Sequence, residues 1–190
     1  MFMKITVLFG SPHKRGPTYH ALEKFLDYIP GEKSISFFDA YKIGAKPCTD
    51  CKFCKKNFAC IYDDLNELYQ NLNSCELLIL AYPIYNASFT SPMKAILDRM
   101  QPFYYARKSN EKRAKNAVII TTQGSSDKNY ELCMNEQIAP NLKLLNIKNL
   151  HYFSIKNTDN LDFDIDNFFS KSENKIMNII KKIYNTNNYF

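Results

Sequence analysis

Four of the six cysteines lie within thirteen consecutive positions, and their spacing is the strongest chemical signal in the sequence. Cys48, Cys51, Cys54 and Cys60 follow the pattern Cys-x2-Cys-x2-Cys-x5-Cys, in which three thiols converge and a fourth returns after a short loop. Iron-sulfur clusters are commonly held by such compact runs of thiolates. A structural zinc ion usually takes two cysteine pairs separated by a longer linker. The pattern therefore favours a 4Fe-4S cluster, with free or redox-active thiols and zinc as the alternatives.

The surroundings of these cysteines bear on their protonation. Four lysines flank the segment, at Lys46, Lys52, Lys55 and Lys56. Their positive charges would favour thiolates over thiols. The remaining two cysteines, Cys75 and Cys133, fall at a predicted strand start and in a predicted helix, so we expect both to be small buried residues.

A second group of polar side chains occupies the run Gly10-Ser-Pro-His-Lys-Arg-Gly-Pro-Thr18. It contains two glycines, two hydroxyls and three potential cations, and it joins an apolar strand to a helix N-terminus. Backbone N–H groups at such a terminus suit a phosphate, with Ser11 and Thr18 as hydroxyl donors and Arg15 or His13 as the charge. The run is neither a P-loop nor Gly-x-Gly-x-x-Gly, which disfavours ATP hydrolysis and Rossmann-type binding. A simple polar turn is the alternative.

The elements that must position these groups form an α/β pattern, in which apolar runs alternate with segments of helical period. Strands are predicted at residues 4–9, 33–38, 76–82, 116–122 and 148–155. Helices are predicted at 18–29 with Thr18 as N-cap, after 63–64, from Ser91 as N-cap, at 128–145 and at 168–184, followed by a frayed tail.

Five strands joined by four crossovers indicate a doubly wound parallel sheet in the order 2-1-3-4-5. Such sheets bind ligands beyond the carboxyl ends of their strands, where the strand order reverses. This rule selects three loops, at residues 10–17, 83–91 and 123–127.

Length and composition limit the class of protein. The chain has 190 residues, 45% of them hydrophobic, and a net charge of +6, so we expect one domain over residues 1–190 with a cysteine-rich insertion at about 46–62. The charge favours anionic ligands without requiring nucleic acid. No signal peptide is visible, and the longest apolar stretch is about half of the ~18 residues that a membrane helix needs. A cytoplasmic protein without membrane attachment is expected.

Three motifs in the same order resemble the NADPH-dependent FMN reductases. The run from Gly10 to Thr18 is similar to that family's Gly-Ser-Pro-Arg-x-x-Gly-Asn-Thr signature. Tyr82-Pro-Ile-Tyr-Asn-Ala-Ser88 and Pro92-Met-Lys-Ala-Ile-Leu-Asp-Arg99 resemble its Ser/Thr-Pro-Val-Tyr loop and Lys-x-Phe-x-Asp-Arg helix. The cysteine segment resembles the iron-sulfur flavoproteins, whose compact Cys-x2-Cys-x2-Cys motif binds a 4Fe-4S cluster. The similarity covers roughly residues 1–125.

The resemblance implies a flavodoxin-like fold and an FMN site. The phosphate would be held by Ser11, His13, Arg15, Gly16, Pro17 and Thr18. The flavin ring would lie against Pro83, Ile84, Tyr85, Asn86 and Ala87, with Thr122, Gln123 and Gly124 on its remaining edge. The sequence departs from the family at Pro17, which stands in place of Asn and lacks an N–H, and at His13, which stands in place of Arg.

The favoured function is an FMN-dependent oxidoreductase that passes electrons between NAD(P)H or a redox carrier, FMN and a 4Fe-4S cluster. The cofactor supplies the chemistry, so no catalytic residue is assigned. One alternative is a cluster-free FMN or quinone reductase, and the other is a non-enzymatic zinc-binding interaction module. We expect a homodimer or homotetramer, because the cysteine segment follows the second strand and would reach the flavin of a neighbouring subunit. The choice between NADH and NADPH stays open, since no dinucleotide fingerprint is present.

Overall fold

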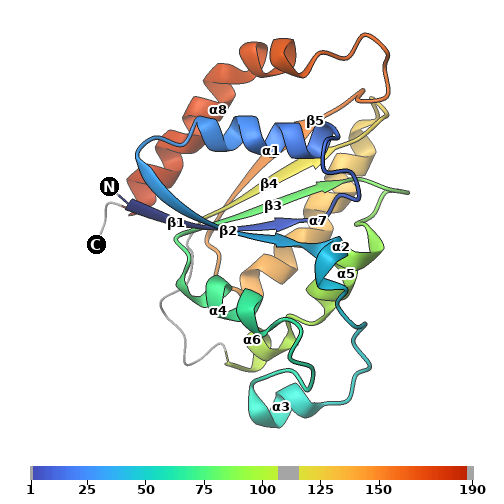
Figure 1. Cartoon of the computed structure of the whole chain (residues 1–190), viewed down its shortest axis with the longest axis vertical. Helices are drawn as coiled ribbons and strands as arrows, with labels where there is room; N and C mark the ends of the chain where they lie inside the picture. The colour runs from blue at the N-terminus through green and yellow to red at the C-terminus, as the bar shows by residue number, and fades with distance from the viewer. Residues whose placement is uncertain (1, 107–115, 188–190) are drawn as a thin grey trace.

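The computed structural model describes residues 2–106 and 116–187. At its centre lies a five-stranded, all-parallel sheet in the order β2-β1-β3-β4-β5 (Figure 1). The strands are β1 (Phe2–Phe9), β2 (Glu32–Asp39), β3 (Leu77–Pro83), β4 (Asn116–Thr122) and β5 (Asn149–Ile155). The predicted fold and strand order are confirmed, and each predicted strand boundary falls within two residues of the observed one.

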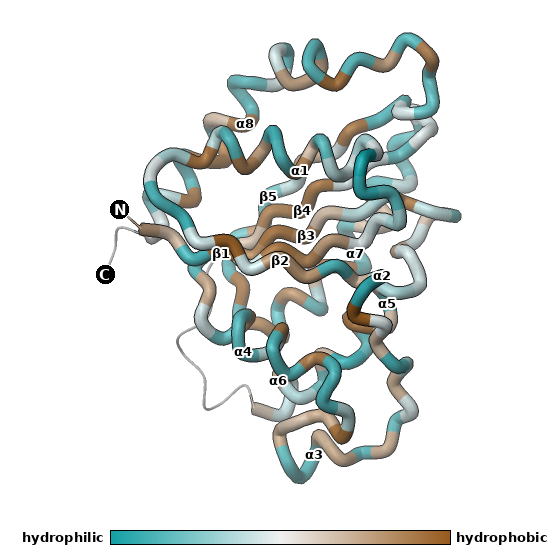
Figure 2. Tube along the Cα trace, viewed as in Figure 1, coloured by the Kyte–Doolittle hydropathy of each residue, from teal (hydrophilic) through white to brown (hydrophobic). Residues whose placement is uncertain are grey.

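The burial of each strand follows from its place in the sheet. Every residue of β3 and β4 is buried, because both strands are central and carry nearly continuous apolar runs. The edge strand β2 is mostly exposed or half-buried, with only its last two residues buried. In Figure 2 the hydrophobic colour is concentrated along the central strands.

Helices cover both faces of the sheet. Helices α1 (Pro17–Asp27) and α8 (Ile165–Asn187) lie on one face (Figure 1). The opposite face is covered by α4 (Asn66–Ser74), α5 (Ser91–Asp98), α6 (Gln101–Ala106) and α7 (Lys128–Leu144). The long connection from β2 to α4 contains two short helices, α2 (Ala40–Ile43) and α3 (Phe53–Asn57). Two apolar clusters, one on each face, fix the helices to the sheet.

Some local expectations are corrected. The N-cap of α1 is Gly16, and Thr18 is a buried residue of the first turn, because Pro17 already starts the helix with its fixed φ. The N-cap of α5 is Thr90 rather than Ser91. Cys133 is exposed on α7, whereas Cys75 is buried as expected.

The remaining differences between prediction and structure concern the lengths of helices. Helices α2, α3 and α6 are not predicted, since each is too short to show a helical period. Helix α8 continues to Asn187, into the tail that was expected to fray, and residues 188–190 of that tail lie outside the described part. Within residues 2–106 and 116–187, none of the helices combines the length and apolar character needed to cross a membrane.

Candidate flavin site and cysteine cavity

Three loops meet at the carboxyl edge of the sheet. They follow β1, β3 and β4, and in Figure 1 they emerge together at the right-hand ends of the strands. The strand order reverses here, because the chain leaves β1 toward β2 on one side and later returns to β3 on the other. This crevice is the usual ligand site of an open α/β sheet. The topology thus brings together the loops selected from the sequence.

In the loop after β1, the serine hydroxyl is buried and the basic side chains are exposed. Ser11 is buried, and its Oγ accepts a hydrogen bond of 3.2 Å from the backbone N–H of His13. The side chains of His13, Lys14 and Arg15 are exposed, and the loop then enters α1 at Gly16. The N–H of Gly16 donates to the His13 carbonyl at 3.3 Å and Pro17 has no N–H, so the Thr18 N–H and the helix dipole give this terminus its positive potential. The arrangement suits a phosphate.

The loop is tied to the end of β4 by a pair of threonines. The hydroxyls of Thr18 and Thr122 lie 2.6 Å apart, and both residues are buried. A hydroxyl has one proton and two acceptor lone pairs, so only one of the two protons is used between them. The other proton remains for a ligand at this edge.

The segment after β3 folds into a tight hairpin. Tyr85 and Ser88 exchange two backbone hydrogen bonds of 3.0 and 2.9 Å around Asn86 and Ala87, whose φ angles are 49° and 55°. Two successive positive φ angles define a type I′ turn, which a β-carbon makes costly at Ala87. The side chain of Tyr85 is 42% exposed beside this turn. The hairpin places an exposed aromatic ring at the carboxyl edge of the sheet.

The end of β4 supplies a polar edge. The side-chain amide of Gln123 donates to the carbonyls of Ser125 and Asp127 at 2.9 and 2.6 Å. Its Oε1 is buried and has no hydrogen-bond partner among the described residues. A buried acceptor of this kind needs a donor, and an N–H of a bound flavin can supply it. The residues of this edge therefore fit an FMN ring.

Sequence reasoning missed one residue at this edge, Asp159 in the loop after β5. Backbone hydrogen bonds join Thr158 to Gln123 at 3.1 Å and Asn157 to Ser125 at 3.3 Å. They place the Asp159 carboxylate so close to Gly124 that a β-carbon there would overlap it. The pKa of Tyr85 is raised by burial and further by Tyr41 and Asp159. The only sequence signal was the position of this loop after a strand adjacent to β4.

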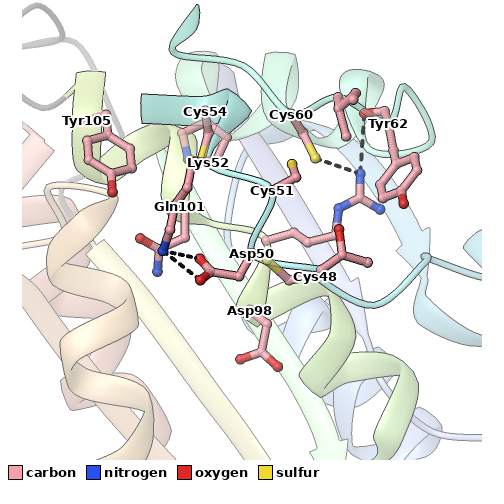
Figure 3. A pocket seen from close by; sticks show the side chains of 14 residues that line it. Cys48, Asp50, Cys51, Lys52, Cys54, Cys60, Tyr62, Asp98, Gln101 and Tyr105 are labelled. Carbon is pink, nitrogen blue, oxygen red and sulfur yellow. Dashed lines mark hydrogen bonds and ion pairs between the residues drawn. The ribbon is translucent and has the colours of Figure 1, made fainter. Parts of the chain in front are cut away.

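The four clustered cysteines surround one cavity of about 410 Å³. Figure 3 shows their labelled side chains together with those of Asp98, Gln101 and Tyr105, which also line the cavity. Within the described residues, no three His, Cys, Asp or Glu side chains converge closely enough to hold a single metal ion. A zinc ion needs its ligands about 2.3 Å from one point, whereas a cubane takes one thiolate at each iron corner. The described thiols therefore share one cavity without forming a site for a single ion.

The backbone of this segment is unusual. Asp50, Lys52 and Phe58 all have φ angles between 53° and 61°, although none of them is glycine. Each such residue costs on the order of 1 kcal/mol or more and persists only where its surroundings hold it. The segment is therefore held by contacts outside itself.

Arg99, at the end of α5, provides those contacts. Its side chain is 1% exposed and forms an ion pair with Asp64, with Nη1 2.7 Å from Oδ2. Its Nη2 donates to Cys60 Sγ and to the Tyr62 carbonyl, both at 3.3 Å, and the guanidinium lies over the Tyr62 ring. Burial alone would lower its pKa, but the hydrogen bonds to Asp64 and Cys60 raise it. Its Nη1 also donates to the Lys46 carbonyl at 3.3 Å, so the cation joins both ends of the cysteine segment to the body of the protein.

At Cys54, burial and the neighbouring cysteines outweigh the flanking lysines. Burial raises the pKa of Cys54, and charges on the other three cysteines raise it further. Lys52 instead pairs with Asp50 at 2.6 Å, and the ammonium of Lys46 lies over the Tyr62 ring. The influence of the other three thiols on Cys54 agrees with four sulfurs gathered around one space.

The two candidate sites are separate within the chain. Among the described residues that line the cysteine cavity, none comes from the three loops at the carboxyl edge. The cavity lies beside α3 and α6, which contact each other below the sheet in Figure 1. The predicted FMN residues and the predicted metal ligands therefore form two sites rather than one.

The doubly wound sheet, with a phosphate-type loop after β1 and an aromatic hairpin after β3, defines a flavodoxin-like protein. The family model of NADPH-dependent FMN reductases matches residues 3–153. The chain belongs to this family. This confirms the predicted class of enzyme, which is an NAD(P)H-dependent flavin oxidoreductase that uses FMN. The alternative of a non-enzymatic zinc module is not supported.

Individual relatives agree with this assignment. An iron-sulfur flavoprotein of Methanocaldococcus jannaschii is 27% identical over 70% of this chain and 67% of its own length. One of Archaeoglobus fulgidus is 29% identical over 66% of this chain and 58% of its own length, so the chain matches only part of these relatives. An NAD(P)H:quinone oxidoreductase from Methanothermobacter marburgensis has a TM-score of 0.74 at 15% identity, covering 100% of this chain and 98% of that one. This last likeness establishes the fold.

Proposed function

We propose that the protein is an FMN-dependent oxidoreductase that takes electrons from NAD(P)H or a redox carrier and passes them to a 4Fe-4S cluster held by its own cysteines. The observation that carries this proposal is the lining of one cavity by Cys48, Cys51, Cys54 and Cys60. The names of the two archaeal iron-sulfur flavoproteins support it.

The carboxyl-edge loops would hold FMN. The Ser11 hydroxyl and the hydroxyl and N–H of Thr18 at the start of α1 would bind its phosphate, with His13 and Arg15 as cations beside it. The 85–88 hairpin, Gln123 and Gly124 would orient its ring. When bound, FMN accepts a hydride and releases electrons to an acceptor. The protein therefore contributes binding and orientation, and no side chain is needed as an acid or base.

The cysteine cavity would hold the cluster. Its four thiols are the donor set that iron-sulfur cubanes take, and Arg99 places a buried positive charge against Cys60, which suits an anionic cluster. Cys48 and Cys51 are exposed, so the cluster would lie near the surface where a redox carrier or a small-molecule acceptor can approach.

Metal and flavin analysis of anaerobically purified protein tests the proposal. We expect about one FMN and, for a 4Fe-4S cluster, about four iron and four sulfide per chain. In the Cys51→Ala variant, the brown iron-sulfur absorbance and the iron should be lost while the flavin spectrum stays. The matched control is Cys133→Ala, because Cys133 is exposed and lies outside the segment. It should retain both chromophores.

The flavin and iron contents decide between the proposed function and its alternatives. Native protein that contains flavin but no iron would contradict the cluster assignment and favour a cluster-free FMN or quinone reductase. Iron retained in the Cys51→Ala variant would show that these cysteines are not the ligands of the cluster. Native protein that contains neither flavin nor iron would contradict the whole proposal.

We also propose that the protein is a homodimer or homotetramer in which the cysteine segment approaches the flavin of a neighbouring subunit. Phe53, Phe58 and Ile61 are 37%, 57% and 54% exposed on this segment, an apolar surface beside the cavity. Sedimentation velocity of the flavin-loaded protein should show a dimer or tetramer, and Phe58→Ser should shift it toward monomer. A monomer at micromolar concentration would contradict the intersubunit path.

A further inference from the structure

The loop that follows β5 is fixed to the end of β4 by backbone hydrogen bonds. The N–H of Gln123 donates to the Ile155 carbonyl at 3.0 Å, and the N–H of Thr158 donates to the Gln123 carbonyl at 3.1 Å. The N–H of Asn157 donates to the Ser125 carbonyl at 3.3 Å. These bonds continue the pairing of β4 with β5 beyond the sheet, at the same end as the loop after β3 (Figure 1). The loop therefore has a defined position beside the proposed ring site.

The carboxylate of Asp159 lies between the end of β4 and the hairpin after β3. A β-carbon on Gly124 would overlap both oxygens of this carboxylate, so Asp159 fills the space that a side chain at position 124 would need. The pKa of Tyr85 is raised by burial, by Tyr41 and then by Asp159, which places the same carboxylate near the hairpin. Gly124 and Tyr85 are both proposed contacts of the flavin ring. One carboxylate thus stands beside two parts of the ring site.

The charge of Asp159 is not neutralised by a neighbour. The residue is exposed, and it forms no ion pair within residues 2–106 and 116–187. Lys156, three positions earlier, pairs instead with Glu131 on α7, with Nζ 2.6 Å from Oε2. The cations proposed for the phosphate, His13 and Arg15, belong to the loop after β1. A full negative charge therefore stands beside the proposed ring.

A fixed charge beside a flavin ring acts unequally on its two oxidation states. The oxidised ring is neutral, whereas the ring that holds two electrons and one proton is an anion. A neighbouring carboxylate repels the anion and has little effect on the neutral ring. Charge near the ring is one of the means by which a protein sets the potential of a bound flavin. The consequence is a lower reduction potential, which makes the reduced ring a stronger electron donor.

We propose that Asp159 lowers the reduction potential of the bound FMN through its negative charge, which acts across Gly124. The proposal rests on the proposed FMN site at the carboxyl edge of the sheet. Asp159 is then a positioning residue that acts by its charge and takes no part in proton or hydride transfer. Gly124 is required for this arrangement, because any larger residue at that position would displace the carboxylate. The function of Asp159 is to increase the driving force with which electrons leave the flavin.

The test compares the midpoint potential of FMN in the loaded native protein and in Asp159→Asn, by reductive titration against reference dyes. Asparagine has the same size without the charge, so the variant should bind reduced FMN about tenfold more tightly. For a two-electron couple this is a shift of about 30 mV to a more positive potential. The Kd of oxidised FMN should stay within about twofold of the native value. The shift should shrink in 1 M salt, where the Debye length is about 3 Å.

Two further variants separate the charge of Asp159 from its place in the loop. Asp159→Glu keeps the charge and should keep the native potential. Asp162→Asn is the matched control, because Asp162 is an exposed carboxylate of the same loop that lines a pocket with Lys171 at the start of α8. It removes an equal charge and should leave the potential and the Kd of oxidised FMN unchanged.

The potential and the two affinities distinguish the ways in which the proposal can fail. Native protein that binds no FMN would contradict the proposed function itself. FMN-loaded Asp159→Asn with the native potential would overturn the role of Asp159 and leave the FMN site in place. Equal weakening of oxidised and reduced FMN, or a shift that does not respond to salt, would show that the residue only shapes the loop, and would overturn the electrostatic role. An equal shift in Asp162→Asn would overturn the assignment to Asp159.

Discussion

Replacement of Arg99 by methionine is expected to lower the free energy of unfolding by about 3 kcal/mol, the lower end of the range for breaking a buried ion pair from one side. Methionine fills a similar space, but it leaves the Asp64 carboxylate, 21% exposed, without its partner. It also removes the hydrogen bonds to Cys60 and to the Tyr62 carbonyl. The melting temperature should fall by about 6 to 12 °C for a domain of this size.

Urea unfolding followed by circular dichroism measures this effect, and two further variants control it. Asp98→Asn removes the neighbouring carboxylate, which pairs with Lys94 on the surface of the same helix, and should cost about 0.5 kcal/mol or less. Arg99→Met combined with Asp64→Leu removes both charges and should recover most of the loss. Equal stability of Arg99→Met and the native protein would show that the ion pair does not hold the segment.

The pH dependence of this difference has a definite sign. Hydrogen bonds from Arg99 lower the pKa of the Asp64 carboxyl in the folded state. A lowered folded pKa stabilises the protein above the ordinary carboxyl pKa of about 3.9, and this stabilisation is lost as the pH falls through the lowered value. The gap between the native protein and Arg99→Met should therefore be constant from pH 7 to about 5 and shrink below about pH 4. A gap that widens in acid would assign the effect to another group.

The sheet could be predicted from the sequence because its signals are local. The apolar runs of β3 and β4 are long enough to identify buried strands, and the crossover pattern then fixes the strand order. The three loops at the carboxyl edge follow from that order alone. The grouping of the four cysteines followed from their spacing, although the cluster itself stays a proposal.

The contacts that complete the sites depend on residues far apart in the chain. Arg99 lies 35 positions from Asp64 and 39 from Cys60, and no sequence pattern links them. Thr18 and Thr122 are 104 positions apart. Helix α3 was missed because it has five residues and is bounded by Lys52 and Phe58 in left-handed conformation, where a glycine would normally signal the turn. Tertiary contacts set these features, so local propensity gives no indication of them.

The separation of the two sites makes their effects independent. Arg99 acts on the cysteine segment, whereas the paired threonines join the loop after β1 to the end of β4. A variant at one site should therefore leave the cofactor of the other in place. The threonine pair offers the sharper test of flavin binding, because its two hydroxyls can be removed together.

In the double variant Thr18→Val and Thr122→Val, FMN affinity is expected to fall about 10- to 100-fold while the apoprotein stays folded. Removing both partners of a buried hydrogen bond with residues of the same shape is nearly neutral, whereas Thr18→Val alone leaves the Thr122 hydroxyl without a partner and costs about 1–3 kcal/mol. The affinity falls because the remaining hydroxyl proton no longer reaches the phosphate, a loss of about 1.5–3 kcal/mol.

Thermal unfolding with and without FMN reads out this change. At a concentration of about 100 Kd, FMN stabilises the native protein by about 2.7 kcal/mol, which corresponds to about 5 to 10 °C. At the same concentration the double variant should show at most half of that shift. Thr121→Val is the control, because it removes a neighbouring hydroxyl that bonds Ser154 at 2.8 Å, and its shift should match the native one. A full shift in the double variant would mean that FMN binds without this pair, because ligand stabilisation depends only on affinity for the folded state.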